Sequence, residues 1–508
     1  MIFGLVVICV IVFSVFIYYE FFHKEEEKII SEPAVIQIDD RISPLTPPAV
    51  GFEIQRIRKH GIEEIMRKKG NSWKKQPNFS YNLTINSMKS ENLSFTGWDT
   101  WYGGWEPIGA IDEDQEFVDI EFTIFETEQR FLRKTNIEVE KIELQFNSKE
   151  GRWTGDDYFG DPDGYGHFNG ENYEVWFDIR LKDYDGDSIP YWTEVNILNT
   201  DPKVDDSQLD PDEDGIPTTW EWKWKYPHNF SDNHSFLDPD YDGLDNIEEY
   251  KMEKWLASPF QPEIYIEADF MYGKTLGPDY VFWEESQQLL IEKFSQRQYK
   301  RARNTSNSIT VHIDDGRIGG GGEYFDHYGE YINQASGIVS EYYKYNFDDD
   351  RKGIFRYLVM VFDAGWAHPQ DYKGWYDVMG VGASPNFLLK LFRGFNIEPR
   401  MRRLVQSIQV MHETGHTCNL IDYCQGIDNA SKDAIDYWKN YQSCMNYHWM
   451  YRPAPHLRIL WGKDYGLMLD YSDGSRNETG HPDCDDWSQL DISYFQKSAH
   501  LIEGIEIM

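Results

Sequence analysis

The stretch MRRLVQSIQVMHETGHTCNLID, residues 401–422, decides the fold that we expect for the C-terminal half of this chain. One face of a single helix is indicated by residues that recur at spacings of three or four: Met401, Val405, Ile408, His412 and His416. Both imidazoles therefore extend an apolar stripe that points into a domain. Together with the intervening Glu413 they form the HExxH pattern of a metal-binding helix. An exposed helix with two incidental histidines is the plainer alternative.

A zinc site for catalysis needs three protein ligands, and the residues after the helix suggest the third. Asn419 is expected to end the helix, because Asn readily takes the left-handed conformation found at helix ends. The reversed chain would then return Asp422, six residues beyond His416, to the metal. We expect His412, His416 and Asp422 to hold zinc. If Asp422 does not reach the metal, His448 or Asp436 is the alternative ligand.

A second motif, SCMNY at residues 443–447, follows the elongated HExxH pattern. The pair resembles the metzincins, zinc endopeptidases defined by HExxHxxGxxH/D and a later methionine turn, although Asn replaces the Gly here and Asp the last His. The resemblance implies that Met445 lies under the histidines and that Tyr447 reaches the zinc or the oxyanion. It also implies hydrolysis of protein or peptide substrates by a zinc-activated water, with Glu413 as general base and Tyr447 helping zinc to stabilise the oxyanion.

The residues before this helix predict the rest of an α/β (α+β) catalytic domain over residues 261–508. Apolar runs at residues 263–270, 308–315 and 355–364 read as strands, and residues 281–296 as a helix between the first two. A further helix is expected near residues 328–343, and an edge strand at residues 374–383.

Three acidic segments upstream repeat at spacings of 27 and 28 residues: DYDGDSIPYWTE, DPDEDGIPTTWE and DPDYDGLDNIEE. Each has carboxylates at positions 1, 3 and 5, Gly or Ser at position 6, and Glu at position 12, which is the oxygen-rich pattern of a calcium loop. Ser188 should weaken the first loop, because a side chain is unfavourable at the sharp turn. The repeats, over residues 183–260, resemble EF-hand-like and thrombospondin type 3 calcium repeats. The expected Ca²⁺ ligands are Asp183, Asp185, Asp187, Glu194, Asp210, Asp212, Asp214, Glu221, Asp238, Asp240, Asp242 and Glu249. We expect a spacer that stiffens when calcium binds; an acidic solvated linker is the alternative.

Residues 73–182 alternate apolar and polar side chains, as in Val118, Ile120, Phe122 and Ile124. Such strands, with one buried face, predict an antiparallel β-sandwich. Residues 23–72 are interrupted by prolines and read as a stalk or linker.

The first residues favour export. Residues 2–19 are almost entirely apolar, so we expect a transmembrane anchor at residues 1–22, with a cleaved signal peptide as the alternative. The expected location is the cell membrane, with the catalytic domain outside or secreted after cleavage. Glycosylation is consistent with eight sequons, at Asn78, Asn82, Asn92, Asn229, Asn233, Asn304, Asn429 and Asn477. Two disulfides, with three possible pairings, could join Cys418, Cys424, Cys444 and Cys484.

The net charge of −38 argues against a nucleic-acid partner, which requires clustered Lys and Arg. The expected molecule is therefore multidomain: a membrane helix, a β-sandwich, calcium loops and a metzincin-like domain. A different class of function is the alternative, namely a calcium-stiffened surface or adhesion protein whose metalloprotease-like domain is not catalytic.

Overall fold

A computed structural model describes residues 38–67, 74–90, 93–102, 105–130, 133–157, 164–226, 233–271, 281–301, 308–325, 347–361, 378–382, 399–429, 431–447, 449 and 469–494. Arg41–Met508 form one compact unit, whose described part contains three β-sheets. Two of the sheets are antiparallel and one is parallel.

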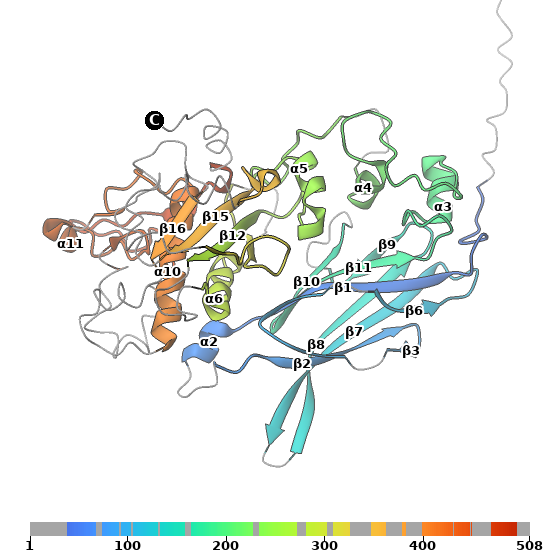
Figure 1. Cartoon of the computed structure of the whole chain (residues 1–508), viewed down its shortest axis with the longest axis horizontal. Coiled ribbons are helices and arrows are strands. Elements are labelled where there is room, and N and C mark those ends of the chain that lie inside the picture. Colours follow the sequence, from blue (N-terminus) through green and yellow to red (C-terminus); the bar gives the residue numbers. More distant parts are fainter. Residues whose placement is uncertain are drawn as a thin grey trace, which may run out of the picture. The chain divides into compact units, whose positions relative to one another are not determined.

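The two antiparallel sheets form a β-sandwich (Figure 1). The first has the order β10-β11-β1-β5, with β6 also on β1: β10 (Gly166–Asn169), β11 (Tyr173–Leu181), β1 (Ala49–Lys59), β5 (Asp99–Trp101) and β6 (Trp105–Ala110). The second has the order β3-β2-β7-β8-β9, with β4 on β2: β3 (Met88–Lys89), β2 (Asn78–Ile85), β7 (Phe117–Arg130), β8 (Arg133–Asn147), β9 (Arg152–Gly155) and β4 (Leu93–Thr96).

The core of the sandwich is made by the alternating side chains that the sequence indicated. Val118, Ile120, Phe122 and Ile124 of β7 are all buried, because alternate side chains of a strand point to the same face. Phe52 of β1 stacks on Phe122 of β7 and on Phe177 of β11, with ring centroids 5.8 and 5.3 Å apart. The prediction that these runs form strands with one buried face is therefore confirmed.

The expected linker at residues 23–72 needs a correction, because Ala49–Lys59 form β1, which pairs with β11, β5 and β6. Arg56 and Arg58 of this strand are almost completely buried. Arg56 donates to both oxygens of Asp99, and Arg58 donates to Glu174 at 2.9 Å. Their burial is possible because each guanidinium meets a carboxylate, a contact that the sequence of β1 does not reveal.

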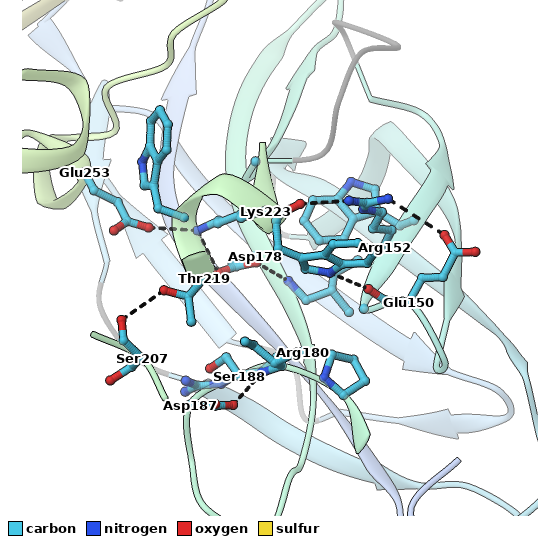
Figure 2. Close-up of a pocket in the computed structure, with 18 of the residues that line it drawn as sticks. Glu150, Arg152, Asp178, Arg180, Asp187, Ser188, Ser207, Thr219, Lys223 and Glu253 are labelled. Carbon is cyan, nitrogen blue, oxygen red and sulfur yellow. Dashed lines mark hydrogen bonds and ion pairs between the residues drawn. The ribbon is translucent and has the colours of Figure 1, made fainter. Parts of the chain in front are cut away.

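The acidic loops end in short helices that pack against the sandwich: α3 (Tyr191–Thr193), η2 (Glu194–Leu198), α4 (Thr218–Lys223), α5 (Asn246–Lys251) and η3 (Glu253–Trp255). Trp222 of α4 donates from its indole to the Glu150 carbonyl at 3.1 Å. Figure 2 shows Lys223 between Glu253 and Asp178 at the wall of a cavity of about 340 Å³. These contacts attach the expected spacer to the sandwich.

The third sheet is entirely parallel, with the order β13-β12-β15-β16 and β14 following β13 along β12: β13 (Thr310–Asp314), β12 (Glu263–Met271), β15 (Phe355–Val361), β16 (Val378–Gly382) and β14 (Tyr324–Phe325). The helices α6 (Glu284–Ser295) and α10 (Pro399–Thr417) contact each other and this sheet (Figure 1). The other short helices are α2 (Ile62–Arg67), η6 (Asp349–Arg351), α11 (Lys432–Tyr437), α15 (Asp486–Gln489) and η8 (Ile492–Tyr494).

The expected fold class and location are both corrected by this architecture. The described residues are mostly β-sheet with few helices, and none of those helices has the length and apolarity needed to cross a bilayer. The predicted single-pass membrane anchor is therefore not supported. Its apolar run, residues 2–19, lies outside the described residues, as does the helix expected near residues 328–343.

Candidate metal centre

The HExxH helix is α10, and it ends where the sequence predicts. Asn419 has a φ of 65°, the left-handed conformation of a helix terminus. The Leu420 amide donates back to the Gly415 carbonyl at 2.9 Å, which closes the reversed turn. His412 and His416, each at most 1% exposed, lie on the buried face of the helix.

The two histidines share their pocket with one carboxylate, that of Asp428. The Nε2 atoms of His412 and His416 are 3.1 Å apart. The Asp428 oxygens lie 3.2 Å from Nε2 of His412 and 3.4 Å from Nε2 of His416. Three donors about 2.0–2.1 Å from a tetrahedral ion stand about 3.3 Å from one another, so these distances fit a common metal ion.

The hydrogen bonds on the far side of each imidazole fix which nitrogen faces the site. Nδ1 of His412 lies 2.9 Å from the Cys444 carbonyl, and Nδ1 of His416 lies 2.9 Å from the Leu420 carbonyl. A carbonyl can only accept, so each Nδ1 carries the proton and, in the neutral rings, each Nε2 presents a lone pair. Two lone pairs at 3.1 Å repel each other unless a cation lies between them. Histidines that bind a metal are usually oriented by such a hydrogen bond from the other ring nitrogen.

Electrostatics also favour positive charge here. Burial alone would lower the pKa of His412, but the adjacent Asp428 carboxylate outweighs burial and raises that pKa to about 9. Burial would raise the pKa of Asp428, yet His412 and His416 together hold it well below its usual range. The three side chains therefore have a strong affinity for a cation, whether a proton or a metal ion.

The carboxylate in the pocket is not the predicted one. Asp422 is exposed in the bend that follows Asn419, and the group that returns to His416 at this point is the Leu420 carbonyl. Further turns over residues 423–427 then carry the chain back at Asp428, 12 residues after His416. Of the two alternative ligands, Asp436 has a side chain 85% exposed, and His448 lies outside the described residues.

The methionine turn lies directly beneath the helix. A Cβ added at Gly415 would stand 2.6 Å from Sδ of Met445, so helix and turn are in close contact. The turn also orients two of the three side chains of this pocket, because the Cys444 carbonyl accepts from His412 and the Met445 carbonyl accepts from the Asp428 amide at 3.1 Å. Met445 is fully buried.

The turn is itself fixed by a buried carboxylate, that of Asp486. Ser443 donates to it at 2.5 Å and Tyr441 at 2.7 Å. The Met445 amide donates to Oγ of Ser443 at 3.0 Å, which completes the turn. The geometry around the metal centre therefore extends to α15.

The predicted catalytic residues both lie beside the ligands. The Tyr447 ring stacks on His412 with centroids 5.5 Å apart, and Tyr447 is 8% exposed. Glu413 is half-buried, and its charge contributes to the raised pKa of His412. A carboxylate and a phenol thus flank the site.

One disulfide joins Cys424 to Cys484, whereas Cys418 and Cys444 are free and buried. The bridge lies between the two chain segments that bring Asp428 and Asp486 to the site. Of the two disulfides considered from the sequence, the structure contains this one.

The acidic loops have the same backbone in all three copies. The amide at position 6 donates to the carboxylate at position 1 in each: Ser188 to Asp183, Gly215 to Asp210, and Gly243 to Asp238. These position-6 residues have φ values of 72°, 93° and 103°. Ser188 is therefore the one L side chain at a left-handed position that the other two loops give to Gly, which agrees with the expected weakness of the first loop.

Each loop gathers three carboxylates closely enough to hold a metal ion: Asp183, Asp185 and Asp187; Asp210, Asp212 and Asp214; Asp238, Asp240 and Asp242. The glutamates at position 12 differ. Glu221 pairs with His234 at 2.9 Å, while Glu249 groups with Asp242 and Glu263. Burial, with Asp187 and Asp185 adding to it, raises the pKa of Glu194 to about 8.

Asp428 and Glu263 were not predicted from the sequence. Asp428 has a φ of 53°, and the sequence signal was an Asp two residues after Gly426, in a turn beside the sequon at Asn429. Glu263 begins a strand that is otherwise largely apolar, and an ionisable residue in such a strand points to a buried partner.

Comparisons with known proteins do not assign a family. No protein-family model and no curated protein matches the chain. Among solved structures, a Drosophila C2-DSL-EGF1 structure matches at 4% identity and a TM-score of 0.18, covering 27% of this chain and 68% of that one. A C2 domain of plant Extended Synaptotagmin 1 matches at 10% identity and 0.17, covering 27% and 95%. L. pealei PLC21 matches at 12% identity and 0.16, covering 34% and 20%. Similarities this low carry no conclusion about fold or function.

Proposed function

We propose that this chain is a zinc-dependent endopeptidase whose metal is held by His412, His416 and Asp428. The observation that carries the proposal is the triangle of donor atoms, with edges of 3.1, 3.2 and 3.4 Å. Two imidazole nitrogens and one carboxylate are a donor set that suits zinc and leaves a position open for water.

A zinc ion bound there supplies the Lewis acidity that makes an attacking water acidic and polarises a substrate carbonyl. Glu413 then accepts the proton of the attacking water and returns it to the leaving amine. Tyr447, which is stacked on His412, is positioned to donate a hydrogen bond to the developing oxyanion. Cys444 and Met445 hold His412 and Asp428 in place through their carbonyls.

The acidic loops are proposed to bind calcium with structural effect. Their oxygen-only donor sets suit a hard cation. Several of their carboxylate oxygens are buried and make no hydrogen bond within the described part of the chain, among them oxygens of Asp185, Asp210 and Glu249. A bound cation would satisfy them.

Three variants of the full chain test the zinc assignment. Asp428→Asn keeps a residue that tolerates a left-handed φ but removes the anionic ligand, so most of the bound zinc should be lost. Glu413→Gln should retain zinc and lose about 10²–10⁴-fold of casein cleavage. Asp422→Asn is the matched control, because Asp422 is exposed, and it should keep both zinc and activity.

The results are read from zinc per chain by metal analysis and from casein cleavage with and without a zinc chelator. Normal zinc content in Asp428→Asn, or lost zinc in Asp422→Asn, would refute the ligand set. Wild-type chain that binds zinc but cleaves no casein would instead support the non-catalytic alternative.

A further inference from the structure

The third acidic loop differs from the other two because its carboxylates are buried against the parallel sheet. Asp240, Asp242 and Glu249 are 1%, 2% and 0% exposed. Neither oxygen of Glu249 has a hydrogen-bond partner among the described residues. A fully buried carboxylate without a partner is costly, so the group must either hold a proton or meet a cation.

A fifth carboxylate, outside the repeat, lies close to two of the loop carboxylates. Oxygens of Asp242, Glu249 and Glu263 all lie within 4.8 Å of one another. Glu263 is the first residue of β12 and is 4% exposed. Its amide donates to Oδ2 of Asp242 at 3.0 Å, so the loop and the strand are in direct contact.

In the described part of the protein no Lys or Arg side chain forms an ion pair with these five acids, although Arg356 favours the charged form of Asp242 and Arg56 that of Glu263 from farther away. Within those residues, the single ion pair recorded for these five acids joins Glu263 to Nε2 of His312 at 2.9 Å. Arg56 lies 2.9 Å from Nδ1 of the same ring. A guanidinium can only donate, so Nδ1 accepts and His312 is the neutral ring that donates from Nε2 to Glu263. The histidine therefore brings a hydrogen bond but no positive charge.

We propose that the third loop binds a calcium ion whose ligands include Glu263 in addition to Asp238, Asp240, Asp242 and Glu249. The ion then fastens the loop to β12. Through the Glu263–His312–Arg56 contacts it also fastens the parallel sheet to β1 of the sandwich. This inference rests on the calcium part of the proposed function and is independent of the peptidase part.

The test compares Glu263→Gln with Glu171→Gln, an exposed control on the sandwich, in the full chain. Glutamine can still accept the hydrogen bond from His312, but it removes a charge from the site. In calcium-binding titrations, one class of site in Glu263→Gln should weaken about tenfold or more, because affinity follows the ligand charge count. Relative to the wild-type chain, the thermal midpoint of Glu263→Gln should be lower in calcium, because a ligand is lost. It should be higher in chelator, because without the cation the substitution removes a buried anion.

A purely structural role for Glu263 would shift the midpoint in the same direction under both conditions, and that result overturns the inference. Calcium affinity equal to that of Glu171→Gln also overturns it while leaving calcium binding by the loops intact. If the wild-type chain binds no calcium, the calcium part of the proposed function fails as well.

A measurement on the wild-type chain covers the case in which Glu263→Gln does not fold. Calcium should slow amide hydrogen exchange in β12 and β13 as well as in the loop at residues 238–249. Slowing confined to the loop would contradict a ligand on β12.

Discussion

Replacement of Gly415 by Ala should separate stability from metal affinity. Gly415 lies inside α10 between the two histidines, and a Cβ there would stand 2.6 Å from Sδ of Met445 and 3.1 Å from a ring carbon of Tyr471. Ala in place of Gly favours a helix by about 1 kcal/mol. Overpacking of a core costs about 1–3 kcal/mol. Because a methionine side chain adapts, the overpacking cost should lie in the lower half of this range, so the net loss of stability should be at most about 1 kcal/mol.

Zinc binding should suffer more than stability does. To make room, Met445 must move by about 1 Å, given an ordinary contact of about 3.5–4.0 Å. The carbonyls of Cys444 and Met445 orient His412 and Asp428, so the displacement reaches two ligands. Changes in such supporting contacts lower metal affinity about 10–100-fold.

The assay is competition for zinc with a chromophoric chelator, alongside urea unfolding, for Gly415→Ala, Met445→Ala and the double variant. The double variant should regain part of the lost affinity, because Met445→Ala removes the obstructing atoms. Wild-type zinc affinity in Gly415→Ala would refute the reasoning. So would additive effects of the two single substitutions on zinc affinity, because the loss could then not be caused by the close contact between helix and turn.

Two further outcomes are expected. In chelator, the thermal midpoint should fall as pH rises from about 4 to 8. Burial raises the pKa of Asp187 to about 6 and the pKa of Glu194 to about 8. The folded chain therefore holds protons in this pH range that the unfolded chain releases, and the folded state loses stability as pH rises. Saturating calcium should abolish that fall, and a pH-independent midpoint in chelator would contradict it. Reduction of the Cys424–Cys484 bridge, which spans 60 residues, should lower the free energy of unfolding by about 4 kcal/mol in urea titrations.

Local sequence patterns predicted the individual strands and helices of this fold better than they predicted which elements contact one another. Alternation correctly located the buried faces of β7, β8 and β11, since it depends only on strand geometry. β1 was taken for a linker because prolines interrupt the sequence just before it, and its buried Arg56 and Arg58 gave no sign of a core strand. Their partners Asp99 and Glu174 are distant in sequence, and only the folded chain brings these charges together.

The candidate centre shows the same limit. Helix periodicity placed His412 and His416, and the tendency of Asn to adopt positive φ placed the helix end at Asn419. The identity of the third side chain in the pocket depends on how many turns follow the helix. A rule based on sequence spacing cannot give that number, and the turns bring Asp428 rather than Asp422 to the histidines. Likewise the acidic repeat supplied its own ligands, whereas Glu263 belongs to a different element and shares no periodicity with them.

The buried contacts of His312 with Arg56 and Glu263 have a consequence for modularity. A shortened protein starting at the parallel sheet would leave one side of His312 facing water, and the severed sandwich would lose the contacts of Arg56 with His312 and of Arg58 with the Val311 carbonyl. Shuffling of such pieces among genes, common for independently folding modules, should be poorly tolerated here. We therefore expect the sandwich, the acidic loops and the parallel sheet to occur together in related proteins.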